Sequence, residues 1–293
     1  MQRLSRDHTV PVDQRYRVLE PALTVTAGET IVVETINHMA PVVRSEQDLH
    51  PHGSPGYRER EETGPIYVRG AHPGDALAIR VERIELVGLP HAHGSGPLAE
   101  AYPQAPLSFP VEDAHCKLPG GLRVALAPMI GDIYTTPLSP SGPYCDHGGN
   151  MDFTEVRSGN TLYLPVFHEG GLLVMGDVHA FQGDGELFGE GGECAADVTV
   201  TISIDRRYRS PRPLVETPDA IICLACRDRL FDAVKLATED MVALLRRLHS
   251  VSGEDAYVFC TMAGSVRVGR SLARPEWTER SILVGLSVPK HIR

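Results

Sequence analysis

The sequence predicts a mainly β fold: a β-sandwich or jelly-roll-like core with a C-terminal α+β portion that contains two helices. Short β-branched runs separated by Gly and Pro turns fill residues 1–212, as in sandwich proteins. After Arg212 the apolar residues change to helical spacing. No clean linker separates these parts. We therefore expect residues 1–212 to form the core that carries the functional site, with residues 213–293 packed on the same fold.

The first strands are expected where alternating or β-branched residues adjoin a turn. Residues 16–19 alternate and residues 30–36 are rich in β-branched side chains, so both are expected to be strands. A Pro-Gly-Asp turn at 73–75 leads into a period of two over 76–86, which predicts another strand. Residues 87–110 are dominated by Gly and Pro without a period, so we expect a loop there.

The second half of the core and the C-terminal portion follow the same logic. Further core strands are expected at residues 122–127, 161–166, 171–179 and 197–204. Apolar residues at helical spacing predict a helix over 228–249. A capping-box-like start at Ser252 predicts a second helix to about residue 262, and residues 281–288 are expected to close the chain as a strand.

Composition limits the partners and the compartment. A net charge of −10 over 293 residues argues against nucleic acid, whose phosphates require a basic face. The first residues lack the apolar centre of a secretory signal, and no 18-residue apolar window occurs, so we expect a cytoplasmic protein with no membrane partner. The six Cys are accordingly expected to be reduced thiols. Exposed sheet edges predict a homo-oligomer, in the form of a dimer.

Residues 144–193 concentrate His, acidic residues and Gly, and this stretch is the candidate site. Asp177 and His179 are two residues apart on a predicted strand, so their side chains should share a face. Burying a carboxylate and an imidazole together is costly unless a metal or a hydrogen-bonded catalytic pair compensates. The Gly-Asp-Gly-Glu run that follows allows a sharp turn, which would return Glu186 to the same point.

A second candidate group precedes this strand. His147 and Asp152 flank a Gly-Gly-Asn-Met turn that lets the backbone approach a ligand. Cys145 lies two residues before His147, which leaves a Cys/His nucleophile as an alternative. Three other histidines lie in a loop-like segment and are expected to be solvated, although their entry into the site stays open: His38, His50 and His52.

These motifs resemble the acetamidase/formamidase family. The resemblance is carried by residues 148–152, 159, 162–166, 176–186 and Glu193, and extends to residues 64–75, the C-terminal helices and residues 288–290. It implies hydrolysis of a small carboxamide to a carboxylate and ammonia, on a mostly β fold with a divalent metal in the site. By position, Asp152, Asp177, His179 and Glu186 fall on the family's motif, whereas the residues around His147 vary.

A set of roles follows from the resemblance together with amide chemistry. Asp177 and His179 are expected to bind the metal, with Asp152 and His147 completing the shell. Glu186 or Glu193 is expected to carry a proton from the attacking water to the leaving nitrogen, with Asp152 also among the catalytic residues. Mixed nitrogen and oxygen ligands favour zinc, and calcium, manganese and magnesium stay open.

Two other functions stay open from the sequence. One is a non-catalytic β-sandwich module that binds calcium or a carbohydrate through its acidic Gly-rich loops. The His in the candidate ligand set argues against it, because structural calcium sites use oxygen ligands. The other is a metal-dependent hydrolase of a different carbonyl substrate, such as a lactone or a cyclic amide.

Overall fold

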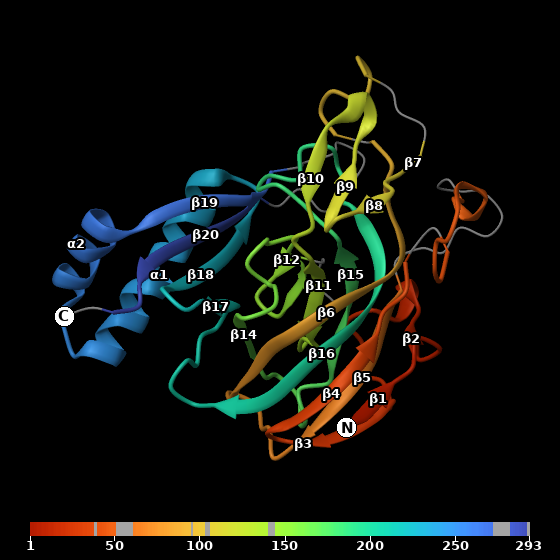
Figure 1. Ribbon diagram of the computed structural model, residues 1–293. Coiled ribbons are helices and arrows are strands. Elements are labelled where there is room, and N and C mark those ends of the chain that lie inside the picture. Colours follow the sequence, from red (N-terminus) through yellow and green to blue (C-terminus); the bar gives the residue numbers. More distant parts are fainter. Residues whose placement is uncertain are drawn as a thin grey trace.

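The computed structural model describes residues 1–37, 40–50, 61–94, 96–102, 106–139, 144–271 and 282–291. Its regular structure is mainly strand, and both α-helices lie in the C-terminal portion (Figure 1). The predicted mainly β fold with two C-terminal helices is confirmed. Neither helix in the described ranges is long and apolar enough to cross a lipid bilayer.

One row of hydrogen-bonded strands runs from the N-terminus into the C-terminal portion. In spatial order it contains β1 (Gln2–Leu4), β4 (Glu29–Glu34), β16 (Glu193–Asp205), β6 (Ala76–Ala92), β14 (Thr161–Pro165), β17 (Leu214–Glu216), β18 (Ala220–Arg227), β20 (Ile282–Pro289) and β19 (Ser265–Arg270). β1 is parallel to β4, and the remaining neighbours are antiparallel. β7 (Leu107–Ser108) pairs with the end of β6.

A second row lies behind the first. In spatial order it contains β3 (Leu23–Thr26), β5 (Glu62–Arg69), β15 (Leu173–His179), β11 (Met129–Thr135), β13 (Gly148–Asn150) and β12 (Tyr144–Cys145), and β2 (Thr9–Val10) also pairs with β5. A separate small sheet contains β8 (Val111–Glu112), β9 (His115–Lys117) and β10 (Arg123–Ala125). Short 3-10 turns occur at Val12–Gln14, Glu46–Asp48 and Pro119–Gly121.

The two rows enclose the main hydrophobic core. Figure 1 shows β6 and β16 in front of β11 and β15. Fully buried apolar side chains from both rows share one cluster, among them Ile31, Ile79, Val200, Ile66, Ile133 and Met175. The rows meet where His179, the last residue of β15, pairs with Glu193, the first residue of β16. A sandwich that joins its layers at this pair places the end of β15 beside the start of β16.

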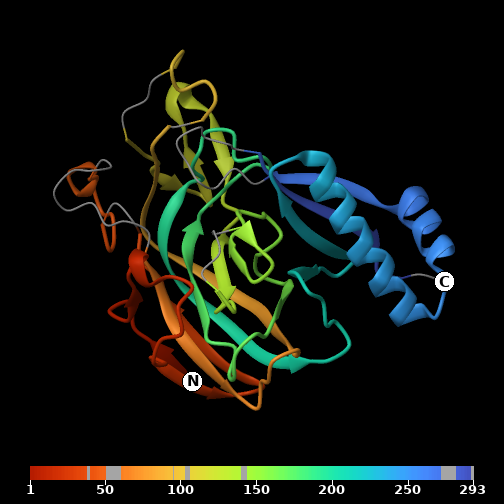
Figure 2. The same ribbon diagram turned by 180° about the vertical axis from the view of Figure 1, so that it is seen from behind.

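The helices cover one face of the sheet's C-terminal extension. α1 (Leu230–His249) and α2 (Gly253–Ala263) bury apolar side chains against β18 and β20, as the helical spacing predicts. Figure 2 shows both helices on one side of the molecule, away from the N-terminal strands. The predicted cap is present, because the Ser252 hydroxyl accepts a hydrogen bond of 3.0 Å from the Asp255 N–H. The opposite face of the extension packs on Phe153, which approaches Gly269 and Gly285.

Two predictions about elements are wrong. The expected strand at residues 16–19 is absent, and Tyr16 has a φ of 61°, which a strand does not tolerate. The expected loop over residues 87–110 is strand up to Ala92, since β6 continues along β16. Gly88 makes this continuation feasible: it has a φ of +98°, and an ideal Cβ there would lie 2.2 Å from the Val43 carbonyl oxygen.

Candidate active site

Three titratable side chains meet at the junction of β15 and β16. His179 is fully buried, and its Nε2 lies 3.0 Å from Glu193 Oε1 and 3.6 Å from Asp177 Oδ1. Candidate ligand atoms of Asp177, His179 and Glu193 all lie within 4.8 Å of one another. This group, the junction triad, has the spacing of a site for one divalent cation.

A second group shares the same histidine. Asp152 Oδ1 lies 3.9 Å from His179 Nε2. Candidate ligand atoms of Asp152, His179 and Glu186 also lie within 4.8 Å of one another. The structure thus brings together every acidic residue that the sequence placed in the site, from a turn, a strand end and a Gly-flanked loop.

The backbone at the three loop and strand carboxylates is unusual. Asp152, Asp177 and Glu186 have φ values of 46°, 53° and 47°, in the left-handed region that non-glycine residues avoid. Such outliers persist where the surroundings enforce them, and they cluster at functional sites. Gly131 on β11 makes room for two of these residues: an ideal Cβ there would lie 2.7 Å from both Asp152 Oδ1 and the Asp177 carbonyl oxygen.

Gln182 fixes the tautomer of His179. The Gln182 amide nitrogen donates to the Asp152 carbonyl oxygen at 2.7 Å, so its amide oxygen faces His179 Nδ1 at 2.6 Å. An amide oxygen only accepts, so Nδ1 carries the proton. In the neutral ring Nε2 therefore presents its lone pair to the junction triad.

The electrostatics of the triad favour a cation. Burial lowers the pKa of His179, but the carboxylates of Glu193 and Asp177 act in the opposite direction and leave it well above its usual value. Burial raises the pKa of Glu193, although His179 opposes this shift. The negative field that attracts a proton to Nε2 also attracts a metal ion to the same place.

Arg270 belongs to the site, and the sequence reasoning missed it. It is 1% exposed, and its Nε lies 3.4 Å from Asp152 Oδ2 and 3.3 Å from Glu186 Oε2. Its Nη1 donates to the Asn150 carbonyl oxygen at 3.3 Å. Arg270 ends β19, in the C-terminal portion, so the site is not confined to residues 1–212. The alternation of Val and Arg over residues 266–270 could have predicted a strand there. It could not have predicted that Arg270 reaches Asp152 and Glu186.

The structure does not bring His147 to the other predicted ligands. The His147 ring packs against Tyr16 and Tyr134, with ring centroids 4.8 Å and 6.0 Å away. Burial, helped by the positive charge of Arg15, lowers its pKa to about 3. The reason is local: His147 lies in the turn before β13, and Gly148–Asn150 extend as a strand paired with β11 and do not form a turn, so His147 is not folded back towards Asp152.

The remaining candidates from the sequence are His38, His50, His52 and Cys145. His38 and His52 lie outside the described residues, as does the side chain of Cys145. His50 is described, but it belongs to neither group of candidate ligands. The Cys/His alternative therefore stays untested.

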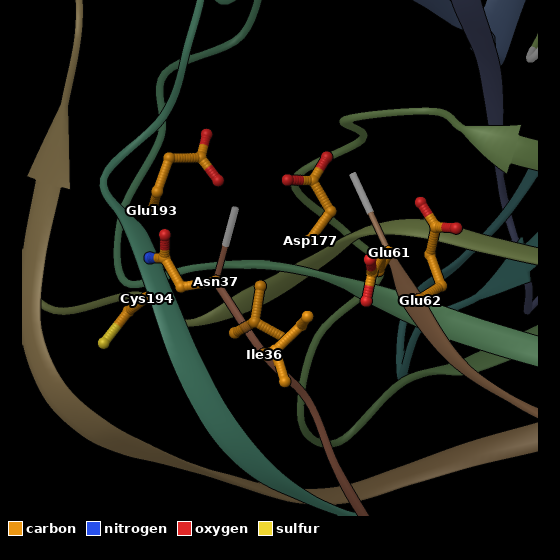
Figure 3. Close-up of a pocket in the computed structure, with 8 residues that line it drawn as sticks. Ile36, Asn37, Glu61, Glu62, Asp177, Glu193 and Cys194 are labelled. Atoms are coloured by element: carbon orange, nitrogen blue, oxygen red, sulfur yellow. The ribbon is translucent and has the colours of Figure 1, made fainter. Parts of the chain in front are cut away.

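A small acidic cavity opens beside the junction triad (Figure 3). Asp177 and Glu193 lie on facing sides of it, with Asn37 next to Glu193 and Glu61 and Glu62 beyond Asp177. Its free volume is about 10 Å³, which is room for one water-sized molecule. The cavity therefore offers the triad contact with a small polar ligand.

Comparison with known proteins identifies the family. Residues 139–290, more than half of the chain, match the model of the Acetamidase/Formamidase family. The chain belongs to this family. The resemblance inferred from the sequence motifs is thereby confirmed, and the matched range of this acetamidase/formamidase family member contains the junction triad, Asp152, Glu186 and Arg270.

Solved structures agree with the family over nearly the whole chain. An acetamidase from Bacillus halodurans is 29% identical with a TM-score of 0.82, over 98% of this chain and 97% of that one. A predicted acetamidase/formamidase from Thermoanaerobacter tengcongensis is 27% identical with a TM-score of 0.86, over 98% and 95%. A formamidase from Methylophilus methylotrophus is 49% identical over 45 residues, 15% of this chain. The chain spans less than two thirds of the length of the curated relatives it matches.

Proposed function

We propose that this protein hydrolyses a small linear carboxamide to a carboxylate and ammonia. The observation that carries the proposal is the buried His179 Nε2, which lies 3.0 Å from Glu193 Oε1 and 3.6 Å from Asp177 Oδ1. The relatives named acetamidase and formamidase support the same reaction.

A divalent metal fits the junction triad. The donor set is one imidazole with its lone pair exposed and two carboxylates, which suits zinc, with manganese, magnesium or calcium as alternatives. Such an ion polarises an amide carbonyl and makes water more acidic when it is bound. Asp152 and Glu186 suit it less, because Arg270 already compensates their charge. The proposal keeps Asp177 and His179 as ligands and adds Glu193, which the sequence had placed in proton transfer.

Glu186 is proposed to move the proton that hydrolysis requires. The water oxygen adds to the carbonyl carbon and the C–N bond breaks, so one proton must pass from the water to the departing nitrogen. The Glu186 carboxylate lies within 4.8 Å of candidate ligand atoms of His179 and Asp152, beside the proposed water. A carboxylate can accept the proton and then donate it. Asp152 is proposed to orient the water next to it.

The cavities bear on the choice of amide. The space of about 10 Å³ beside Asp177 and Glu193 has room for the attacking water and not for an amide. A larger and mostly apolar cavity of about 470 Å³ borders Gln182 and Glu186 and is lined by Phe109, Phe181 and Leu187. A substrate panel should therefore extend to amides with longer apolar acyl chains.

Ammonia release and metal content test the function together. Purified protein is assayed with formamide, acetamide, longer amides and a cyclic amide, before and after chelation and with zinc restored. We expect turnover with about one metal ion per chain, and His179→Ala should lose both. His72→Ala is the matched control, because His72 is exposed and pairs with Glu169. Bound metal without turnover would instead support the calcium-binding module, and no ammonia from any amide would refute the proposal.

A further inference from the structure

Two arginines of β19 reach the loops that carry the site. Arg267 is partly exposed and binds Asp184 at 2.8 Å, Glu155 at 2.8 Å and the Thr154 hydroxyl at 2.9 Å. These are the outer residues of the loops that contain Asp152 and Glu186. Arg270, three residues on, turns inward to Asp152 and Glu186 themselves. One strand thus contacts each loop both at the surface and in the interior.

The backbone ties the same strand to the Glu186 loop. The Gly185 N–H donates to the Gly269 carbonyl oxygen at 2.8 Å, and the Ser271 hydroxyl donates to the Gly185 carbonyl oxygen at 2.9 Å. Gly185 and Arg270 form a parallel bridge. These bonds fix the position of the Arg270 guanidinium relative to Glu186, which follows Gly185 directly.

Arg270 separates the site carboxylates into two pairs. Asp177 and Glu193 face the imidazole of His179, whereas Asp152 and Glu186 share a fully buried guanidinium. We propose that Arg270 is a positioning residue, which holds Glu186 and Asp152 in the orientation needed to accept the water's proton and deliver it to the leaving nitrogen. This inference rests on the proposed amide hydrolysis. Arg270 itself transfers no proton, and the metal ligands do not depend on it.

Two physical arguments support this role. Burying a guanidinium is unfavourable unless its partners compensate it, and Arg270 meets two carboxylates and a carbonyl oxygen. Asp152 and Glu186 both have a left-handed backbone conformation, which would relax towards a commoner one if their carboxylates were released. A fixed partner between them keeps both carboxylates in place before the substrate arrives, and such preorganisation is a large part of catalysis.

The test compares Arg270→Gln and Arg270→Lys with Arg267→Gln in the full-length, metal-loaded protein. For Arg270→Gln we expect kcat for the best amide to fall about 100-fold while KM changes less than about threefold. Metal content by elemental analysis should stay at the wild-type value, and added guanidinium ion should restore part of kcat. The kcat of Arg270→Lys should lie between those of the wild type and Arg270→Gln, because an ammonium keeps the positive charge but cannot contact both carboxylates with the geometry of a guanidinium. Arg267→Gln should keep kcat within about threefold.

Several results would overturn the inference. An unchanged kcat in Arg270→Gln would show that Arg270 does not position the reacting carboxylates. Loss of metal together with activity would place Asp152 and Glu186 among the metal ligands instead. If Arg270→Gln does not fold, the inference is tested with Arg270→Lys. The kcat of that variant must fall while its KM and metal content stay at the wild-type values. Absence of ammonia release from the wild type would refute the hydrolase itself, whereas an active wild type with an active Arg270→Gln refutes only this inference.

Discussion

At the scale of single residues, the site contains backbone conformations that non-glycine residues rarely adopt. Asp152, Asp177 and Glu186 each adopt a positive φ, and each presents its carboxylate to the region around His179. A side chain in this conformation costs roughly 1–2 kcal/mol for most L-residues, and Asp tolerates it better than Glu. Glu186 therefore carries the largest penalty of the three.

A pair of substitutions at Glu186 measures this penalty. Glu186→Ala and Glu186→Gly both remove the carboxylate and should both stop turnover. Only Gly adopts the φ of 47° without strain, so we expect Glu186→Gly to be about 1 kcal/mol more stable than Glu186→Ala. Urea unfolding followed by circular dichroism compares them. Equal midpoints would mean that the loop relaxes once the carboxylate is gone.

His147 is expected to make stability depend on pH. Burial and Arg15 lower its folded pKa to about 3, below the usual value of about 6.5. Between these values the unfolded chain binds a proton that the folded chain does not. The contribution of neutral His147 is therefore present above pH 6.5 and is lost as the pH falls towards 3, by about 1.4 kcal/mol per unit.

The corresponding experiment uses His147→Phe, which keeps an aromatic ring beside Tyr16 and Tyr134. The free energy of unfolding in urea is measured at pH 7 and pH 5 for both proteins. We expect the wild type to lose about 2 kcal/mol more than the variant over this interval. The same loss in both proteins would contradict a neutral, buried His147.

At the scale of elements, the local sequence pattern predicted those strands and helices whose form does not depend on an unusual contact with a neighbouring element. The alternation over 197–204 and the helical spacing over 228–249 correspond to β16 and α1, within a few residues at each end. The extension of β6 to Ala92 was not predictable, because Gly88 and Pro90 indicate a loop until β16 supplies a partner. β11 was not predicted, because Pro128 and Gly131 indicate the end of a strand; in the structure Gly131 lies within β11 and leaves room for Asp152 and Asp177.

The candidate site divides in the same way. Asp152, Asp177, His179, Glu186 and Glu193 carry recognisable motifs within 50 residues of sequence, and the structure brings them together. Arg270 follows Glu193 by a long interval, with two helices and two strands between them, and only the fold of the sheet places it there. His147 is a possible metal ligand and adjoins the Gly-Gly-Asn motif, but its ring packs against Tyr16 and Tyr134, away from the other candidate ligands.

At the scale of the whole molecule, the junction triad lies where the two rows of strands meet. Asp177 and His179 belong to β15 and Glu193 to β16, so a metal bound to all three would connect both layers. The dimer expected from the sheet edges stays a prediction, to be checked by light scattering.

We therefore expect metal removal to destabilise the entire sandwich. A ligand present at 100 times its Kd adds about 2.7 kcal/mol to the folded state. Chelation should lower the Tm of the wild type, and restored zinc should raise it again. His179→Ala should have the same Tm with and without chelator. A wild-type Tm that chelation leaves unchanged would show that no metal bridges the two rows.

The pairing of β19 has a consequence for the timing of synthesis. β19 joins the sheet through β20, which lies between it and β18 yet follows both along the chain. A ribosome therefore releases Asp152, Asp177, His179, Glu186 and Glu193 long before the strand that seats Arg270. The proposed metal ligands are thus complete early, whereas the proposed proton transfer requires residues 282–289 to emerge first. Under the proposed function, translation order would keep an unfinished chain from hydrolysing amides.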